Sequence, residues 1–378
     1  REHKIPILKE IKKIQPNLKL IATPWSAPKW MKTNQGFVGG SLRKDAYETY
    51  AQYFVRYLQE MKAEGLPIHA ITVQNEPLHP GNNPSMYMTS EEQATFIGDH
   101  LIPAMREGQV DDVNVILYDH NPDHIEYPIN IFNNPKVGPN VQGSAFHLYA
   151  GDISALSTVH QQFPDKDIYF TEQWVSSDGD MEGDLLWHAQ NVLIGALSNW
   201  ASIVMEWNLS SNRDMTPHTD GGCTKCLGAV TIDGGAVTRN TAYYVLGHAS
   251  ALIPPGSVRI KSFWKNHGNK AEIESLVDQV AFLRPDGRIA LLLANRSEED
   301  FAISISSDDQ ITLFGKSLAS IVSAPVSAPV PAPVPAPVPA PVAVPVPAPV
   351  PAPVPVAADV ELMPNEVERG RQIKPSRI

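Results

Sequence analysis

An alternation of apolar segments with amphipathic helical segments runs through the first 250 residues and constrains the fold more than any other feature. Apolar, β-branched runs near residues 20, 71, 116, 144, 170 and 204 have the composition of buried parallel strands. The segments between them show helical spacing of apolar residues, as in residues 41–64. Strict β-α alternation of this kind predicts a parallel sheet with helical crossovers.

A closed (β/α)8 barrel requires eight strands, and this alternation supplies six. The chain opens on a helical segment, residues 6–13, which in such a barrel would follow a strand. We therefore predict an α/β fold over residues 1–254, a (β/α)8 TIM barrel that lacks its first two strands. After residue 254 the apolar pattern changes to period two, which predicts a small antiparallel β-sandwich domain over residues 255–323.

The C-terminal part has a different composition. Residues 324–357 consist almost entirely of Pro, Ala and Val, and proline at such density excludes both helix and sheet. This segment is predicted to be an extended linker. Residues 358–378 are mostly polar and are predicted to be disordered.

Charge and cysteine content exclude several classes of function. The net charge of −11 argues against a nucleic-acid partner, and no apolar run is long enough for stable membrane insertion. The histidines are scattered along the sequence, so no metal site is predicted. Cys223 and Cys226 are interpreted as a structural disulfide or two free thiols, and a thiol-redox protein built on them is the less favoured alternative.

Two predicted strands end on a glutamate. The segment Ile68–Pro77 finishes in Asn75-Glu76-Pro77, and residues 168–172 finish in Glu172. In α/β barrels the carboxyl ends of the strands carry the chemistry. Glycosidases need two carboxyl groups, one to protonate the leaving group and one to attack or stabilise the sugar carbon. We predict Glu76 as acid/base and Glu172 as nucleophile, although sequence order alone leaves these roles open. Retention of configuration requires carboxyl groups roughly 5–5.5 Å apart.

Further polar and aromatic residues follow the predicted strands. Indole rings can stack on sugar faces, although core packing explains any single tryptophan equally well. The Asn75 amide can donate to a sugar hydroxyl. His147 and Tyr149 are alternate residues past one predicted strand, so their side chains can point the same way. Glu206 is interpreted as structural, because Trp207, the next residue, is expected to point to the opposite face of the strand. The candidate substrate-binding residues are Trp25, Asn75, Asp119, His147, Tyr149 and Trp207.

Taken together, these motifs resemble family 30 glycoside hydrolases, the glucosylceramidase-like group. The matching segments are residues 22–34, 74–77, 147–149, 170–172 and 206–209. The resemblance implies a TIM barrel with a β domain and a retaining double displacement without metal or cofactor. It assigns acid/base to Glu76 and nucleophile to Glu172. It also implies sugar contacts at Trp25, Asn75, Tyr149 and Trp207, with Asp119 and His147 close by, and a secreted or periplasmic location.

The expected function is therefore hydrolysis of β-glucosides by a retaining glycosidase. The expected partner is a β-linked glucoside, either a glucosylceramide-like glycolipid or a β-1,6-glucan. A carbohydrate-binding, catalytically impaired fragment of such an enzyme is the alternative.

Overall fold

The computed structural model describes residues 3–264, 270–305 and 310–325. The chain divides into two compact units, Arg1–Gly247 and His248–Ile378. The predicted disordered tail, residues 358–378, lies outside the described residues, as does the predicted linker apart from its first two positions.

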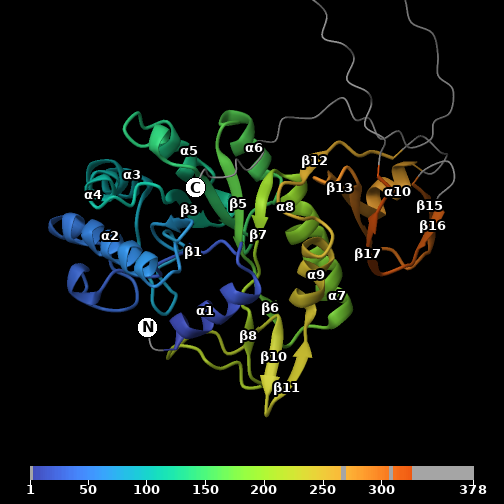
Figure 1. Ribbon diagram of the computed structural model, residues 1–378, viewed down its shortest axis with the longest axis horizontal. Helices are drawn as coiled ribbons and strands as arrows, with labels where there is room; N and C mark the ends of the chain where they lie inside the picture. The colour runs from blue at the N-terminus through green and yellow to red at the C-terminus, as the bar shows by residue number, and fades with distance from the viewer. Residues whose placement is uncertain (1–2, 265–269, 306–309, 326–378) are drawn as a thin grey trace, which may run out of the picture. The chain divides into compact units, whose positions relative to one another are not determined.

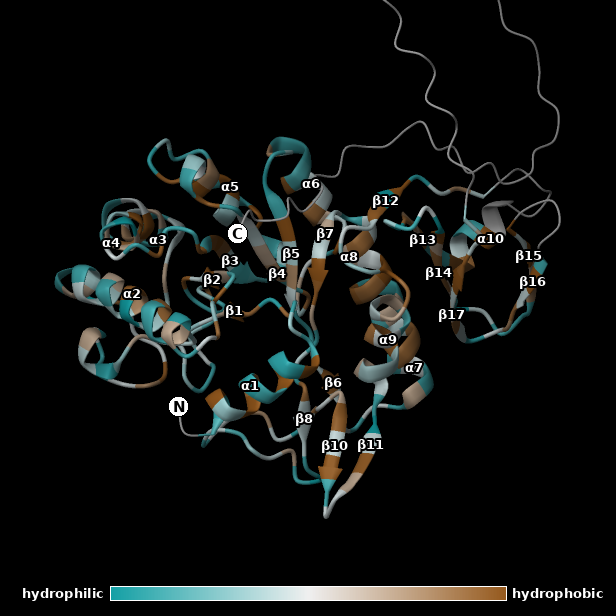
Figure 2. Cartoon of the chain, in the orientation of Figure 1, coloured by the Kyte–Doolittle hydropathy of each residue, from teal (hydrophilic) through white to brown (hydrophobic). Residues whose placement is uncertain are grey.

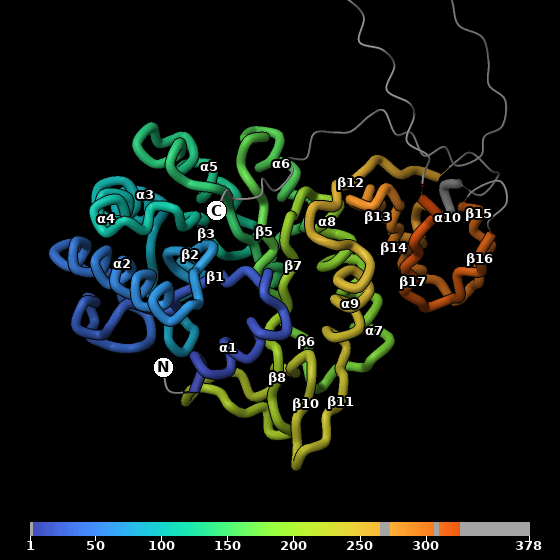
Figure 3. Tube along the Cα trace, viewed as in Figure 1, coloured from blue at the N-terminus to red at the C-terminus, as the bar shows by residue number. Residues whose placement is uncertain are grey.

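Six parallel strands form one sheet in the first unit, in the order β1-β2-β3-β4-β5-β7 (Figure 1). The predicted partial TIM barrel is confirmed, and within the described residues β1 and β7 are the edges of this sheet. Figure 3 follows the chain through the successive β-α units. The strands are β1 (Ile21–Ala22), β2 (Ala70–Thr72), β3 (Asn114–His120), β4 (Gly143–His147), β5 (Asp167–Glu172) and β7 (Ala201–Val204).

Helices connect the strands and cover the outer face of the sheet (Figure 1). Figure 2 shows hydrophobic and hydrophilic residues alternating along α2, which buries one face against the core. Two of the crossovers contain a π-helical turn, at Phe96–Leu101 and His188–Ile194. The helices are α1 (Lys4–Ile14), α2 (Tyr47–Ala63), α3 (Ser90–Thr95), α4 (Ile102–Glu107), α5 (Glu126–Phe132), α6 (Ala155–Gln162), α7 (Met181–Trp187), α8 (Gly195–Ser198) and α9 (Thr241–Ser250).

The concave side of the sheet is filled by one residue from each strand. From β1 to β5 large and small side chains alternate around this layer, and β5 and β7 each contribute a large one. Tyr169 contributes the residue from β5, and its hydroxyl donates to the Asp167 carboxylate at 3.2 Å. The layer consists of Ile21, Ala70, Ile116, Ala145, Tyr169 and Ile203.

Strand β2 is shorter than its sequence pattern predicts. Its pairing ends at Thr72, four residues before Glu76. Beyond it, the N–H groups of Asn75 and Glu76 donate to the carbonyls of Pro24 and Asp119, both at 2.9 Å. These two bonds replace the ladder and keep the segment at the carboxyl end of the sheet.

An insertion between β7 and α9 was not predicted. It contains β8 (Ser210–Ser211), β9 (Cys226–Leu227), β10 (Val230–Asp233) and β11 (Ala236–Arg239). Strand β9 pairs with β6 (Val175–Ser176), which follows Glu172 by three residues. Cys223 and Cys226 form a disulfide here, one of the two alternatives that the sequence left open.

The second unit contains the predicted antiparallel β domain. A sheet of β12 (Val258–Ile260), β13 (Val277–Leu283), β14 (Ile289–Asn295) and β17 (Ser317–Val322) accompanies a hairpin of β15 (Phe301–Ser304) and β16 (Gln310–Leu313). Strand β16 and helix α10 (Lys270–Leu276) were not predicted.

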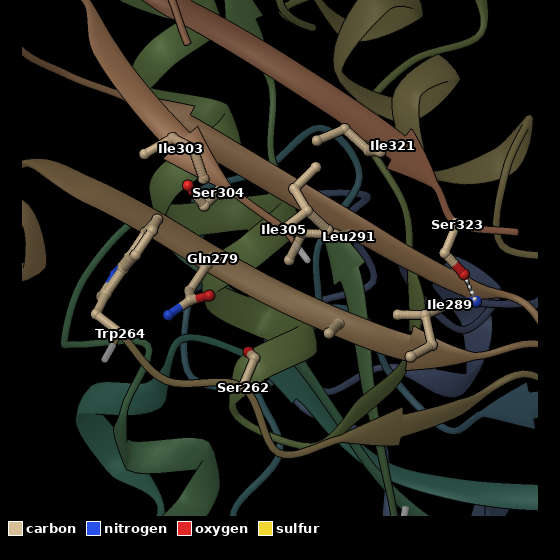
Figure 4. A pocket seen from close by; sticks show the side chains of 11 residues that line it. Ser262, Trp264, Gln279, Ile289, Leu291, Ile303, Ser304, Ile305, Ile321 and Ser323 are labelled. Atoms are coloured by element: carbon tan, nitrogen blue, oxygen red, sulfur yellow. Dashed lines mark hydrogen bonds between the residues drawn. The ribbon is translucent and has the colours of Figure 1, made fainter. Parts of the chain in front are cut away.

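An apolar pocket lies within this second unit. Figure 4 shows its lining, in which the Ile289 N–H donates to the Ser323 hydroxyl at 3.0 Å. The lining contains no acidic or basic side chain, so this pocket has no group for acid-base chemistry. Its larger apolar side chains are Trp264, Ile289, Leu291, Ile303, Ile305 and Ile321.

Candidate functional site

The two strand-end glutamates lie beside one another. Glu76 follows β2 in the left-handed region of backbone space (φ 44°), and its side chain is buried. Glu172 is the last residue of β5. One carboxylate oxygen of each, together with one nitrogen of His147, lie within 4.8 Å of one another. Two carboxyl groups this close can act on the same bond of a substrate.

His147, the last residue of β4, lies between the carboxylates. Its side chain is 1% exposed, and its Nδ1 is 3.0 Å from Glu76 Oε1 and 3.8 Å from Glu172 Oε1. Its Nε2 is 3.2 Å from Asp119 Oδ1. Because both ring nitrogens face carboxylate oxygens, the imidazole can donate through both only when it is protonated.

Asp119 faces Nε2 of His147 and is held by three hydrogen-bond donors. Besides His147, the hydroxyl of Thr171 donates to Asp119 Oδ1 at 2.7 Å and that of Thr72 lies 3.1 Å from Oδ2. Neither threonine was predicted. The only signal in the sequence is a hydroxyl near the end of an otherwise apolar strand.

Irregular pairing brings Asp119 and His147 to this position. The register of β3 against β4 shifts between Tyr118 and His120, and that of β4 against β5 shifts at His147. Tyr118 and Asp119 also have positive φ, 72° and 68°. Bulges of this kind redirect side chains beside active sites, and strained residues cluster there.

Burial and the neighbouring charges shift the pKa of Glu76, Glu172 and His147. Burial disfavours ionised Glu76, but the hydrogen bond and charge of His147 bring its pKa below the ordinary value. Burial raises the pKa of Glu172 to about 7, with the charges of Glu76 and Asp119 adding to the rise and that of His147 opposing it. Burial opposes protonation of His147, but the charge of Glu172 and the hydrogen bonds to Asp119 and Glu76 raise its pKa to about 10.

Below about pH 7 these shifts favour the proton on Glu172 in the free site, whereas the predicted roles require it on Glu76. The two carboxyl groups are close enough to titrate as a pair, so the proton belongs to the pair rather than to either residue. Burial raises the pKa of Glu172, and His147, whose charge opposes such a rise, stands nearer to Glu76 than to Glu172. A substrate oxygen that accepts a hydrogen bond from Glu76 would favour the proton on Glu76 instead of Glu172.

Tyr149 and Asn82 each hold one of the glutamates. The Tyr149 hydroxyl donates to Glu172 Oε1 at 3.1 Å, a contact that favours ionised Glu172. Asn82 Nδ2 donates to Glu76 Oε2 at 2.5 Å. Tyr149 was among the predicted residues, whereas Asn82 was not, because it lies in an irregular loop where no spacing marks it.

Two of the predicted aromatic residues are brought together. The rings of Trp25 and Trp207 have centroids 5.2 Å apart, and a β-bridge joins Trp207 to Trp174. Asn75 is buried beside Glu76, and its N–H is tied to the loop after β1.

Glu206 stands apart from the cluster. Its Oε1 is 2.8 Å from His188 Nδ1, and both side chains are almost fully buried. Burial raises the pKa of Glu206, and the hydrogen bond and charge of His188 oppose the rise. This contact supports a structural interpretation of Glu206.

Within the described residues, Glu76, His147 and Glu172 are also the group whose atoms are close enough to hold a metal ion. His147 engages carboxylates through both nitrogens, so it offers no free lone pair to a cation unless one of these contacts breaks. None of the described helices combines the length and hydrophobicity needed to cross a membrane.

Comparison with known proteins identifies close relatives of both units. Residues 1–253 match the glycosyl hydrolase family 30 TIM-barrel domain, and residues 256–323 match the family 30 beta sandwich domain. The chain is 35% identical over 323 residues to "Endo-1,6-beta-D-glucanase neg1" of Aspergillus fumigatus, covering 79% of this chain and 63% of that protein.

Of two further relatives, one is named as a glucosylceramidase and the other as an endo-β-1,6-glucanase. "Lysosomal acid glucosylceramidase" of Mus musculus is 28% identical over 330 residues, covering 81% of this chain and 62% of that protein. The solved structure "The endo-beta1,6-glucanase BT3312" superposes with a TM-score of 0.77 at 35% identity, over 84% of this chain and 74% of that one. The chain thus spans less than two thirds of the length of the curated relatives it matches.

Proposed function

Because the chain belongs to glycoside hydrolase family 30, we propose that it hydrolyses β-linked glucosides by a retaining double displacement. One observation carries this proposal: Glu76 and Glu172 present carboxylate oxygens within 4.8 Å of one another. That spacing is closer to the separation of a retaining pair, roughly 5–5.5 Å, than to that of an inverting pair, roughly 6.5–9.5 Å.

The reaction proceeds in two steps at this pair. First, Glu172 attacks the anomeric carbon while Glu76 gives its proton to the leaving oxygen, so the glycosidic bond breaks as the glycosyl-Glu172 ester forms. Glu76 then removes a proton from water, which attacks the same carbon and releases Glu172 as a carboxylate. Tyr149 would orient Glu172, and Asn75, Trp25 and Trp207 would bind the sugar.

We propose β-1,6-glucan as the substrate, with glucosylceramide-like glycolipids as the alternative. The support is the identity to proteins named endo-1,6-beta-D-glucanase, 33–35%, against 27–29% to those named glucosylceramidase. A secreted or periplasmic location is also proposed, since the Cys223–Cys226 disulfide suits an oxidising compartment.

A substrate panel tests this proposal. With purified chain, we expect reducing ends to appear from β-1,6-glucan at a higher kcat/KM than glucose from glucosylceramide, and NMR to show the β-anomer of the product first. Faster release from the glycolipid would reverse the substrate order. Initial formation of the α-anomer would contradict the retaining mechanism.

A carbohydrate-binding, catalytically impaired fragment remains the second candidate. The observation that favours it is the open six-stranded sheet, whose inner layer has six side chains instead of a closed ring. Binding of gluco-oligosaccharide in calorimetry, without any turnover of the panel, would select this candidate.

The paired carboxyl groups also predict a pH dependence. Catalysis requires the pair to hold one proton, and burial raises the pKa of Glu172 to about 7. Raising the pH through this value removes the shared proton, so we expect kcat/KM for an aryl β-glucoside to fall above about pH 7. The profile of kcat/KM reports the free enzyme. An activity that stays constant to pH 9 would contradict the shared-proton arrangement.

A further inference from the structure

Both carboxylate oxygens of Glu76 are held in the structure. Oε1 faces His147 Nδ1 at 3.0 Å, and Oε2 accepts from Asn82 Nδ2 at 2.5 Å. Contacts on opposite oxygens fix the rotation of the carboxyl group as well as its position. A general acid depends on this orientation, because its proton must be delivered along one direction.

The loop that carries Asn82 is tied to the insertion after β7. The neighbouring residue, Asn83, donates from Nδ2 to the Gly221 carbonyl at 3.0 Å, and its own carbonyl accepts from Thr219 Oγ1 at 2.7 Å. Gly221 has a φ of +72°, and an added Cβ would lie 2.5 Å from Asn83 Nδ2. A side chain at residue 221 would therefore push the Asn83 amide group out of this position.

The same insertion is anchored beside the other glutamate. The Cys223–Cys226 disulfide closes its turn, Cys226 pairs with Ser176 in β6, and the Ser177 N–H donates to the Lys225 carbonyl at 2.8 Å. Because β6 begins three residues after Glu172, one short segment touches the chain near both carboxyl groups.

We propose that Asn82 is a positioning residue for Glu76, and that the disulfide-closed segment 219–227 holds Asn82 in place through Asn83. This inference rests on the proposed function, in which Glu76 is the acid/base. The amide suits both states of a residue that gains and loses a proton: Nδ2 donates to the carboxylate, and Oδ1 can accept from the acid after a rotation. An aliphatic side chain could do neither.

The test compares Asn82→Ala with wild type on two aryl β-glucosides. With a poor leaving group, which needs full protonation, kcat/KM should fall roughly 10- to 100-fold. With a strongly acidic leaving group, which departs without a proton, the fall should be less than roughly threefold. Asn130→Ala, at an exposed position on α5, is the matched control and should behave as wild type.

A second readout does not depend on turnover. Carboxyl 13C NMR titration, with the Glu76 signal identified by its loss in Glu76→Gln, should show Glu76 of Asn82→Ala titrating roughly one pH unit higher, because a donor to its ionised form is gone. Gly221→Ala and Asn83→Ala should move the signal in the same direction by less. Thermal melts of all variants establish that they remain folded.

The outcomes separate this inference from the proposed function. Asn82→Ala with wild-type leaving-group dependence and an unmoved Glu76 titration overturns the role of Asn82. A shift in Asn82→Ala but none in Gly221→Ala overturns the role of the disulfide-closed segment. If wild type hydrolyses no glucoside, the proposed function fails, while the NMR titration still decides the role of Asn82.

Discussion

Replacing Glu172 with glutamine is expected to lower kcat for aryl β-glucosides by roughly 10⁵-fold or more, the size of effect seen when a catalytic nucleophile is removed. The substitution keeps the shape of the side chain at the end of β5 but cannot form a glycosyl ester. Mass spectrometry with a slow, fluorinated glucoside should detect a covalent adduct on wild type and none on Glu172→Gln. Glu91→Gln, an exposed change on α3, is the control and should be fully active.

Azide distinguishes the two glutamates. Glu76→Ala should still form the glycosyl-enzyme from substrates with good leaving groups, and azide should then attack it and give a β-glycosyl azide. A β-glycosyl azide from Glu172→Ala would show that the roles are reversed. This experiment also decides between the predicted roles and the order of pKa values in the free site, where Glu172 has the higher one.

Replacing His147 with alanine should lower the free energy of unfolding more than replacing any other residue of the site. The side chains of Glu76, Asp119 and Glu172 that face it are 7%, 2% and 12% exposed, and they would lose their shared cation. Breaking a buried ion pair costs roughly 3–5 kcal/mol, which in a domain of this size lowers Tm by roughly 10 °C. His124→Ala is the control, since its contact with Glu126 is exposed and should change Tm little.

The loss should depend on pH in a defined direction. The folded pKa of His147, about 10, lies above its ordinary value of 6.5, so its stabilisation is complete below pH 6.5 and disappears as the pH rises through 10. The pKa of Glu76 is lowered from 4.5, so its share disappears as the pH falls below that value. The difference in Tm should therefore be largest between about pH 4.5 and 6.5. A difference that grows toward pH 10 would contradict this assignment of charge.

Periodicity in the sequence was sufficient to predict the sheet and most helices. The apolar run at residues 168–172 coincides with β5, because a strand covered on both faces consists mainly of apolar residues. The insertion after β7 was missed because its strands are two to four residues long, too short for a pattern to appear.

The site was predictable only in part. Strand ends and the family motifs indicated Glu76 and Glu172, and the structure places them together with His147, Asp119 and Tyr149. The register shifts that aim Asp119 and His147 inward depend on tertiary pairing, which no local pattern encodes. Asn82 reaches Glu76 from a loop, so its contact could be found only in three dimensions.

The charge of the cluster has a consequence for inhibitors. Three carboxyl groups surround one imidazolium, so with one shared proton the cluster still carries a net negative charge. A cation at the position of the sugar ring would therefore be stabilised, as the positive charge of an oxocarbenium-like transition state would be. A glucose analogue with a basic ring nitrogen should bind more tightly than its neutral counterpart. Its affinity should weaken as the pH falls and the remaining carboxylates become protonated.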